Sequence, residues 1–271
     1  MQEIDLESWK NFEDRISELA RQRSKRKSAT GNYISPYLFR GQSRSSWPLT
    51  TTLERYNGPL GLNEYYGVVL ATKPHVETIT SQTWLTPSHS EYSKHLEENG
   101  VPGGEFPGCE YFVYLRHHGF PSPLLDWTRS PYVAAYFAFR DPPSDATKIS
   151  MFAYCEFTAG HKSWSSDEPK ITSLGHNIRS HRRHFQQRSE YTICTIGRAN
   201  EFLYACHADA FMGNTEDQDE LWKFNIPVSE RYKVLSSLEQ YNINAFSLFG
   251  SDESLMETLA IREILLRSRT A

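Results

Sequence analysis

The sequence has few cysteines and no long apolar segment. Its four cysteines are widely spaced and form no C-x-x-C pair: Cys109, Cys155, Cys194 and Cys206. Such spacing argues against a disulfide framework and against a zinc site built from cysteines. The longest uncharged apolar run, at residues 132–139, is far too short to cross a bilayer. We therefore expect a protein with no bound metal and no membrane partner.

The sequence also lacks an excess of positive charge and a recognisable export signal. Its net charge of −4 at pH 7 argues against a dominant electrostatic attraction to nucleic acid, although a local basic cluster can still supply one. The first ten residues do not show the charged and apolar segments of a signal peptide. These features predict a cytoplasmic protein.

What the chain does contain is enough apolar material for a core, with 38% hydrophobic and 13% aromatic residues in a length of 271. Residues 1–30 are predicted to form an amphipathic helix, at 5–24, followed by a basic linker. Residues 31–271 are predicted to form a single domain, with a mainly helical insertion at about 56–108.

The predicted elements indicate a mixed α+β fold. Strands are expected at residues 37–42, 149–157, 190–196, 201–208 and 220–227, and helices at 110–117, 132–139, 229–241 and 252–267. We expect the last helix to begin at an Asp252 cap and to cover one face of the sheet. Residues 158–181 are predicted to form a loop.

The run at residues 124–128 places an acid and a hydroxyl between two predicted helices. Gly119 and two prolines end the first helix, and Ser130 is the expected N-cap of the second. Asp126 and Thr128 therefore meet a helix N-terminus at one corner. Buried polar groups need partners, so this corner is either a structural cluster or one wall of a site.

Arginines mark two further candidate sites. Arg40 ends a predicted strand, and Gly41 after it allows another backbone or a ligand to come close. Residues 179–188 form a basic loop of composition suited to binding a polyanion, with Arg179, Arg182, Arg183 and Arg188 as its arginines. A solvated loop that pairs with acidic neighbours explains the same composition.

Several short motifs occur in a fixed order through the first half of the chain. They read FRGQ at residues 39–42, WPLT at 47–50, LER at 53–55, LRHHGFP at 115–121, LLDWTRSP at 124–131 and YFA at 136–138. In this order the motifs resemble the FRG domain family, named for Phe-Arg-Gly. A weaker likeness continues through QRSEYT at 187–192 and NINAFSLF at 242–249.

The FRG pattern is similar to the ADP-ribosyltransferase superfamily, whose three-part signature corresponds here to Arg40, Thr128 or Ser130, and Glu190. This resemblance implies a split, curved β-sheet with flanking helices and a catalytic set of Arg40, Thr128 and Glu190. It implies NAD as cofactor, held by Phe39, Arg40, Gly41, Gln42, His118, Asp126, Trp127, Thr128, Ser130, Tyr136 and Gln187. The arginines Arg179, Arg182, Arg183 and Arg188 would bind the acceptor substrate.

The resemblance also implies a biological role. FRG proteins of this kind occur as toxins of bacterial toxin–antitoxin and anti-phage systems, so we expect a toxin that a proteinaceous antitoxin neutralises. The acceptor is expected to be RNA, whose modification would block translation, or a protein. The basic loop directly before the predicted catalytic strand favours RNA.

Cleavage of the nicotinamide glycosidic bond passes through an oxocarbenium-like state, so a carboxylate beside the ribose is needed. Strand alternation puts Glu190 on one face with Thr192, and Gln187 on the other unless it lies in the preceding loop. We favour Glu190, because a neutral amide stabilises positive charge only weakly. Arg40, a hydroxyl and Glu190 are therefore expected to meet at one dinucleotide-sized cavity.

Two other functions fit the same residues. His117 and His118, with Asp126, could perform acid/base chemistry in a metal-independent RNase or phosphotransferase. Alternatively, Arg40 and the basic loop could hold a phosphorylated ligand in a non-catalytic binding module.

Overall fold

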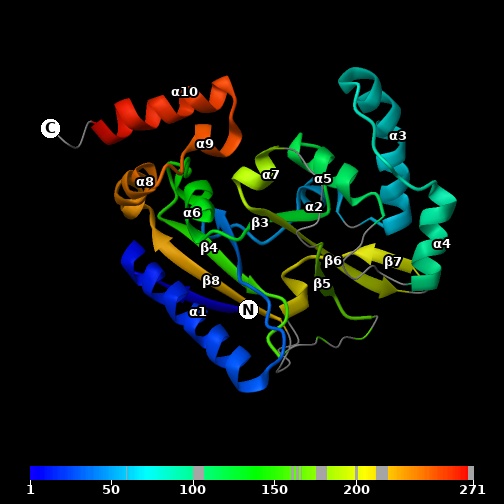
Figure 1. Cartoon of the computed structure of the whole chain (residues 1–271), viewed down its shortest axis with the longest axis horizontal. Coiled ribbons are helices and arrows are strands. Elements are labelled where there is room, and N and C mark those ends of the chain that lie inside the picture. Colours follow the sequence, from blue (N-terminus) through cyan, green and yellow to red (C-terminus); the bar gives the residue numbers. More distant parts are fainter. Residues whose placement is uncertain are drawn as a thin grey trace.

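The computed structural model describes residues 1–58, 60–99, 107–159, 162, 165, 167–174, 182–198, 201–211 and 219–267. These residues form a mixed α+β structure around an open, curved, eight-stranded sheet with strand order β1-β8-β4-β2-β3-β6-β5, in which β7 also pairs with β6 (Figure 1). The strands are β1 Gln2–Asp5, β2 Leu38–Gln42, β3 Leu124–Thr128, β4 Lys148–Cys155, β5 Lys170–Ser173, β6 Ser189–Arg198, β7 Glu201–Tyr204 and β8 Glu220–Pro227. The predicted α+β class is confirmed.

Helices pack on the sheet and lie at both ends of the molecule. They are α1 Trp9–Thr30, α2 Thr52–Asn57, α3 Leu62–Thr80, α4 His89–Asn99, α5 Cys109–His117, α6 Pro131–Phe139, α7 Arg182–Gln186, α8 Arg231–Gln240, α9 Ala245–Phe249 and α10 Asp252–Ala260, with the π-helical turn η3 Ile261–Leu266 after α10. Figure 1 shows α8, α9 and α10 at one end of the molecule and α3 and α4 at the other. The stretch predicted as a helical insertion contains α3 and α4.

Three sequence predictions need correction. The first helix starts at Trp9 because the Ser8 hydroxyl caps it, and the residues before it form β1, which pairs with β8 in parallel. The predicted loop at 158–181 includes β5, an edge strand that depends on β6 for its hydrogen bonds. The last helix is capped by Ser251 rather than by Asp252, and it packs against α9 instead of the sheet.

Helix α6 lies unusually close to β2. A Cβ atom added to Gly41 would lie 2.8 Å from the Ala138 nitrogen and closer still to the Ala134 carbonyl oxygen, both in the α6 backbone. Only glycine permits this approach. The close neighbour expected at Gly41 is therefore the backbone of α6.

The sheet is weakly joined at its centre. β2 pairs with β4 through five residues, and β3 pairs with β6 through five, but β2 and β3 share only the Phe39–Thr128 pair. This junction, called the β2–β3 seam below, divides the sheet into two halves. A site can form there because the backbone ladder stops after one residue pair.

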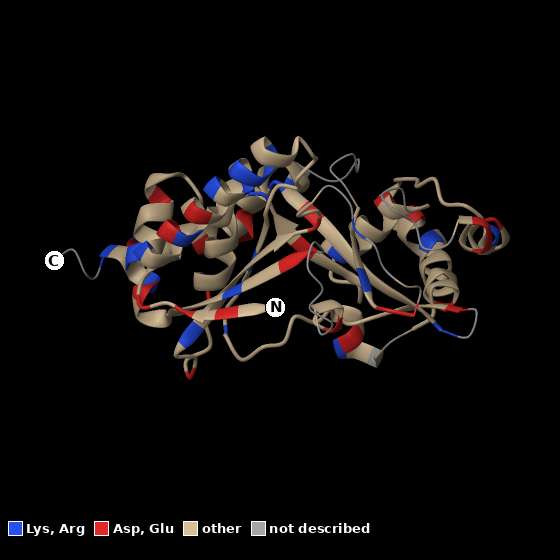
Figure 2. Ribbon diagram, turned by 90° about the horizontal axis from the view of Figure 1, so that it is seen from below, with Lys and Arg blue, Asp and Glu red and all other residues tan. Residues whose placement is uncertain are grey.

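The described residues contain neither a membrane-spanning helix nor a cluster of metal-ligating side chains. No helix there combines the length and apolar character that crossing a bilayer requires. Nor does any group of three or more His, Cys, Asp or Glu side chains come together in a way that could hold a metal ion. Basic and acidic residues are interspersed along the ribbon (Figure 2).

Candidate functional site

A cavity of about 650 Å³ opens at the β2–β3 seam, within the size range of small-molecule sites. Its walls come from both halves of the sheet and from α2, α5, α6, α7 and α9. The lining residues are Phe39, Arg40, Gly41, Gln42, Ser43, Trp47, Pro48, Thr50, Glu54, Arg55, Arg116, His117, Asp126, Trp127, Thr128, Ala134, Phe137, Arg183, Gln187, Ser189 and Phe249. We call this the seam cavity.

Arg40 projects from β2 into one wall of the seam cavity. Its Nη1 donates to the Asp126 carbonyl oxygen at 2.7 Å, while its buried Nε has no hydrogen-bond partner among the described residues. Burial lowers the pKa of Arg40 to about 10, and the Asp126 carboxylate opposes that shift. Arg40 is thus a desolvated cation with unused donor capacity.

Arg116 and Asp126 form an ion pair beside Arg40. The Arg116 Nη2 lies 2.6 Å from the Asp126 Oδ2, and the Arg116 Nη1 donates to the Thr52 hydroxyl at 3.2 Å. The Asp126 Oδ1 and the Arg116 Nε are buried without a partner among the described residues. Buried polar atoms are normally satisfied, so this cluster is incomplete without a ligand or water.

The lining as a whole is positively charged. It contains four arginines (Arg40, Arg55, Arg116 and Arg183) and two carboxylates (Glu54 and Asp126), which gives a net charge of +2 from four minus two. The chain carries −4 in total. The seam cavity therefore has the opposite sign from the molecule and would attract an anion.

Part of the lining, called the aromatic wall, is made by two phenylalanines. Phe137 of α6 and Phe249 of α9 meet edge to face, with ring centroids 5.9 Å apart. The guanidinium carbons of Arg140 and Arg183 each lie 5.5 Å from the Phe249 ring centroid. A planar ring system bound here could stack on apolar surface next to cations.

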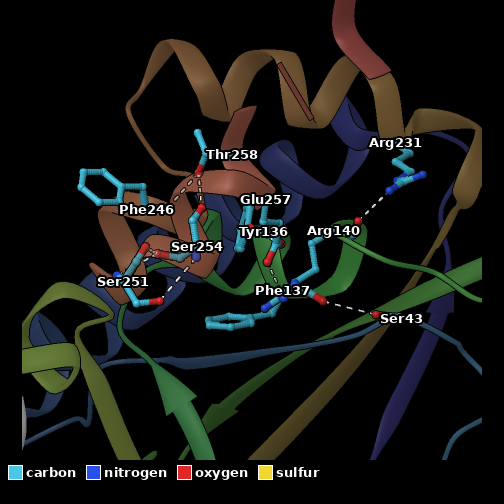
Figure 3. Close-up of polar contacts among 10 residues, drawn as sticks. All are labelled: Ser43, Tyr136, Phe137, Arg140, Arg231, Phe246, Ser251, Ser254, Glu257 and Thr258. Carbon is cyan, nitrogen blue, oxygen red and sulfur yellow. Dashed lines mark hydrogen bonds and ion pairs between the residues drawn. The ribbon is translucent and has the colours of Figure 1, made fainter. Parts of the chain in front are cut away.

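Helix α10 supports this aromatic wall from behind (Figure 3). Glu257 accepts hydrogen bonds from the Tyr136 hydroxyl and from Arg140, both at 2.7 Å. The Thr258 hydroxyl accepts from the Phe246 backbone N–H at 2.9 Å, which ties α10 to α9. The position of Phe249 therefore depends on contacts made by α10, a helix that does not itself line the cavity.

The structure brings together much of the predicted site. The predicted residues that line the seam cavity are Phe39, Arg40, Gly41, Gln42, Asp126, Trp127, Thr128, Arg183 and Gln187. The Thr128 hydroxyl donates to the Gln187 carbonyl oxygen at 2.6 Å and accepts from the Ser130 N–H at 3.1 Å. Thr128 thus fixes the turn before β6 and does not contact Glu190.

Glu190 is not part of the seam cavity. It is 3% exposed, lies opposite Trp127 in the sheet, and its Oε1 accepts from the Arg129 Nε at 2.6 Å. The cavity face of β6 carries Ser189, while Gln187 reaches the cavity from the turn before the strand. Helices α5 and α7 pack on the face of β6 that carries Ser189 and Tyr191, through His117 and His184, and Glu190 points to the other face. Of the two candidates, Gln187 lines the seam cavity and Glu190 does not.

Three further predicted residues also lie elsewhere. Ser130 caps α6 by accepting from the Val133 N–H at 3.3 Å, and Tyr136 is buried against α10. His118 lines a second hollow of about 990 Å³, whose wall includes Tyr114. None of the three lines the seam cavity.

Among the arginines predicted to bind the acceptor, Arg183 is the one whose described side chain lines the seam cavity. Arg188 is exposed in a left-handed conformation with φ of 49° and does not line the cavity. Arg179 lies outside the described residues, as does the side chain of Arg182 in α7.

Arg116, Arg55 and Phe249 were missed as site residues. Arg55 and Arg116 stand inside the LER and LRHHGFP motifs, so their presence in those ordered motifs was the available signal. Phe249 follows the seam residues by more than a hundred positions, and its role depends on how α9 packs.

The family comparison matches part of this chain. The FRG domain model matches residues 35–147, a segment that contains β2, β3 and α6 and so most of the seam cavity. This match supports the FRG family for that segment. No curated protein and no solved structure matches the chain.

Proposed function

Taking residues 35–147 as an FRG domain, we propose that the chain is an NAD-dependent ADP-ribosyltransferase whose seam cavity binds NAD. The observation that carries this proposal is the buried Nε of Arg40, which has no partner among the described residues and lies beside the Arg116–Asp126 pair. A guanidinium offers a planar fork of donors that matches phosphate oxygens. In this proposal Arg40 and Arg116 hold the pyrophosphate.

The aromatic wall would receive a ring of the dinucleotide. Phe137 and Phe249 line the seam cavity together with Trp47. Stacking on such rings suits both the nicotinamide and the adenine, so the wall supports a dinucleotide without fixing its direction.

The carboxylate beside the reacting ribose is assigned to Asp126 in this proposal. Asp126 and Glu54 are the carboxylates in the lining, and Asp126 has an oxygen without a partner among the described residues. An anion placed there would stabilise the positive charge that develops as nicotinamide leaves. Glu190 would act only as the partner of Arg129.

Matched amide variants test this assignment. We expect Asp126→Asn to lower nicotinamide release from NAD about 100-fold or more, because it removes the charge that stabilises the transition state. Glu190→Gln serves as the control and should retain the turnover number while lowering the free energy of unfolding. Equal loss of turnover in both folded variants would contradict the assignment to Asp126.

Arg40→Lys tests the phosphate contact. Lysine keeps the positive charge but lacks the planar fork of donors of a guanidinium. We expect KM for NAD to rise about tenfold, which corresponds to the loss of one charge-assisted hydrogen bond. Calorimetric titration of NAD into wild type and variant would measure the affinity directly. Binding of NAD without nicotinamide release under any condition would favour the phosphoryl-ligand binding module instead.

The RNase alternative has weaker support. His117 lines the seam cavity, whereas His118 lines the second hollow, so the two imidazoles do not face one substrate. Acid/base cleavage of RNA by this pair would need both at the same phosphodiester.

We also propose RNA as the acceptor, with a toxin role in a toxin–antitoxin or anti-phage system and a proteinaceous antitoxin as partner. Support comes from the FRG match and from Arg183, a basic-loop arginine that lines the cavity. Incubation with labelled NAD and either purified RNA or RNA-free cell protein tests the acceptor. Label that enters protein alone would exclude RNA.

A further inference from the structure

Three side chains from separate elements form a hydrogen-bonded chain that ends at the seam cavity. The Nε2 of His117, at the end of α5, lies 2.6 Å from the Tyr191 hydroxyl of β6. The same hydroxyl lies 3.2 Å from the Nδ1 of His184 in α7. His117 lines the cavity, whereas Tyr191 and His184 are buried behind it.

The single proton of a tyrosine hydroxyl allows two arrangements of this chain. If the Tyr191 hydroxyl donates to His184, then the His117 Nε2–H donates to the tyrosine oxygen and the His117 Nδ1 carries a free lone pair. In the reverse arrangement His184 donates to the tyrosine oxygen, Tyr191 donates to His117, and the His117 Nδ1 carries a proton. No described residue makes a hydrogen bond to the His117 Nδ1.

We propose that the His117 Nδ1 removes the proton of the acceptor nucleophile during transfer, and that Tyr191 and His184 relay charge away from it. This inference rests on the proposed function, since it concerns the second half of that reaction. It gives His117 the catalytic task and gives Tyr191 and His184 positioning tasks.

The step balances without another reactant. The bond between the ribose C1′ and the nicotinamide nitrogen breaks, and its electron pair neutralises the pyridinium as nicotinamide leaves. A lone pair of the acceptor hydroxyl or amine forms the new bond to C1′, and its proton moves to the His117 Nδ1. The Nε2 proton of His117 can then pass to the Tyr191 oxygen as the tyrosine proton moves to His184.

The charges around His117 indicate that a bound anion would raise its pKa and so make it a stronger base. Burial, helped by the charges of His184, Arg116 and Arg183 and opposed by Asp126, lowers the pKa of His117 to about 4. These groups come from α5, α7 and β3, which surround the imidazole. A pyrophosphate on the arginines would offset their charge and raise the pKa towards its ordinary value.

Chemical rescue provides the main test. We expect His117→Gln to lower ADP-ribose transfer to purified RNA about 100-fold at pH 7, with little change in NAD affinity, and we expect added imidazole to restore much of the rate. His118→Gln, a change in the exposed neighbour that faces the second hollow, is the matched control and should transfer like wild type. Full activity of folded His117→Gln, or loss that imidazole does not restore, would overturn the inference.

Tyr191→Phe tests the relay, because it removes the hydroxyl and keeps the ring. We expect the acidic side of the profile of transfer rate against pH to move to a different pH. If Tyr191 served packing alone, the rate would change by the same factor at every pH. An unshifted profile would remove Tyr191 and His184 from the inference.

A spectroscopic readout keeps the test independent of variants that fail to fold. In wild type labelled with ¹⁵N-histidine and saturated with ADP-ribose, the Nδ1 of His117 should be unprotonated at pH 8. A protonated Nδ1 there would overturn the inference. Failure of the proposed function looks different, because wild type would then release no nicotinamide from NAD with any acceptor.

Discussion

The two halves of the sheet have cores of different chemistry. Around β1, β8, β4 and β2 the core under α1, α6 and α8 is mainly Phe, Leu, Ile and Ala, and Phe12, Phe139 and Phe224 are completely buried. We call this the aliphatic half. The core of the other half, under α3, α4 and α5, is rich in tyrosine and is called the tyrosine half: Tyr65, Tyr66, Tyr92, Tyr111, Tyr191 and Tyr204.

The difference is in how each half fixes its part of the seam cavity. Buried hydroxyls need partners, so the tyrosine half is held by directed hydrogen bonds such as that from Tyr65 to the Pro121 carbonyl oxygen and that between Tyr191 and His117. The aliphatic half is held by non-directional burial of apolar area. Arg116 and Asp126 stand on the tyrosine half, whereas Arg40 comes from β2 of the aliphatic half.

Gly41→Ala should break the aliphatic half and give the largest effect. The new methyl group would overlap the α6 backbone at Ala134 and Ala138, which cannot move without leaving the sheet. We expect a loss of about 3 kcal/mol or more in the free energy of unfolding, measured by urea denaturation.

Gly67→Ala is the matched control for that experiment. A Cβ at Gly67, inside α3, would meet nothing closer than 3.9 Å, and alanine favours a helix by about 0.5–1 kcal/mol. This variant should be as stable as wild type or more stable. Similar behaviour of the two variants would refute the close packing of α6 on β2.

Local signals explain which elements the sequence could predict. The strands at 37–42 and 220–227 and the helices at 110–117 and 132–139 are bounded by glycine, proline or capping residues, and the structure confirms each of them. β1 and β5 were missed because they are four-residue strands at the sheet margin. Their formation depends on partners that are distant in the sequence.

The candidate site shows the same limit. Ordered motifs located Arg40, Asp126 and Thr128, and strand alternation predicted that Glu190 and Gln187 point to opposite faces unless Gln187 lies in the preceding loop. Alternation does not show which face carries a cavity. That depends on where α5 and α7 pack, which is why the sequence did not show that Glu190 lies outside the seam cavity.

The pH dependence of stability sharpens the comparison in the tyrosine half. Burial, together with the charge of Arg40, lowers the pKa of His207 to about 3, and its Nε2 lies 2.9 Å from the Thr192 hydroxyl oxygen. The unfolded chain has a histidine pKa of about 6.5, so it binds more protons than the fold between about pH 6.5 and 3. Stability is therefore fully present above pH 6.5 and is lost as the pH falls.

His207→Gln should reduce that loss. One such histidine contributes about 1.4 kcal/mol per pH unit to the slope, so the variant's unfolding free energy should fall less steeply between pH 6 and 4.5. Urea denaturation across this range measures the slope. His75→Gln, at an exposed position on α3, should leave it unchanged; identical slopes for wild type and His207→Gln would contradict the prediction.

Tyr65→Phe should show that directed bonds stabilise the tyrosine half. The Tyr65 hydroxyl donates to the Pro121 carbonyl oxygen at 2.6 Å, at the corner between α5 and β3. Removing it leaves a partly buried carbonyl without that donor, which costs about 1–2 kcal/mol. Tyr33→Phe, where the ring is 62% exposed, should change stability by less than about 0.5 kcal/mol. Equal effects at both positions would mean that the hydroxyl at Tyr65 is dispensable.

Glu257→Gln should give the smallest change in stability, because its ion pair with Arg140 leaves both side chains 31% exposed. We expect a loss of about 0.5–1 kcal/mol, as for other partly solvated pairs. Glu257 holds α10 to α6, and α10 in turn holds α9, which carries Phe249. Because the substitution should loosen Phe249, we expect KM for NAD to rise while the turnover number is retained. Glu263→Gln, which removes an exposed pair with Arg267, controls for charge. An unchanged KM in Glu257→Gln would show that the aliphatic half positions the aromatic wall without help from α10.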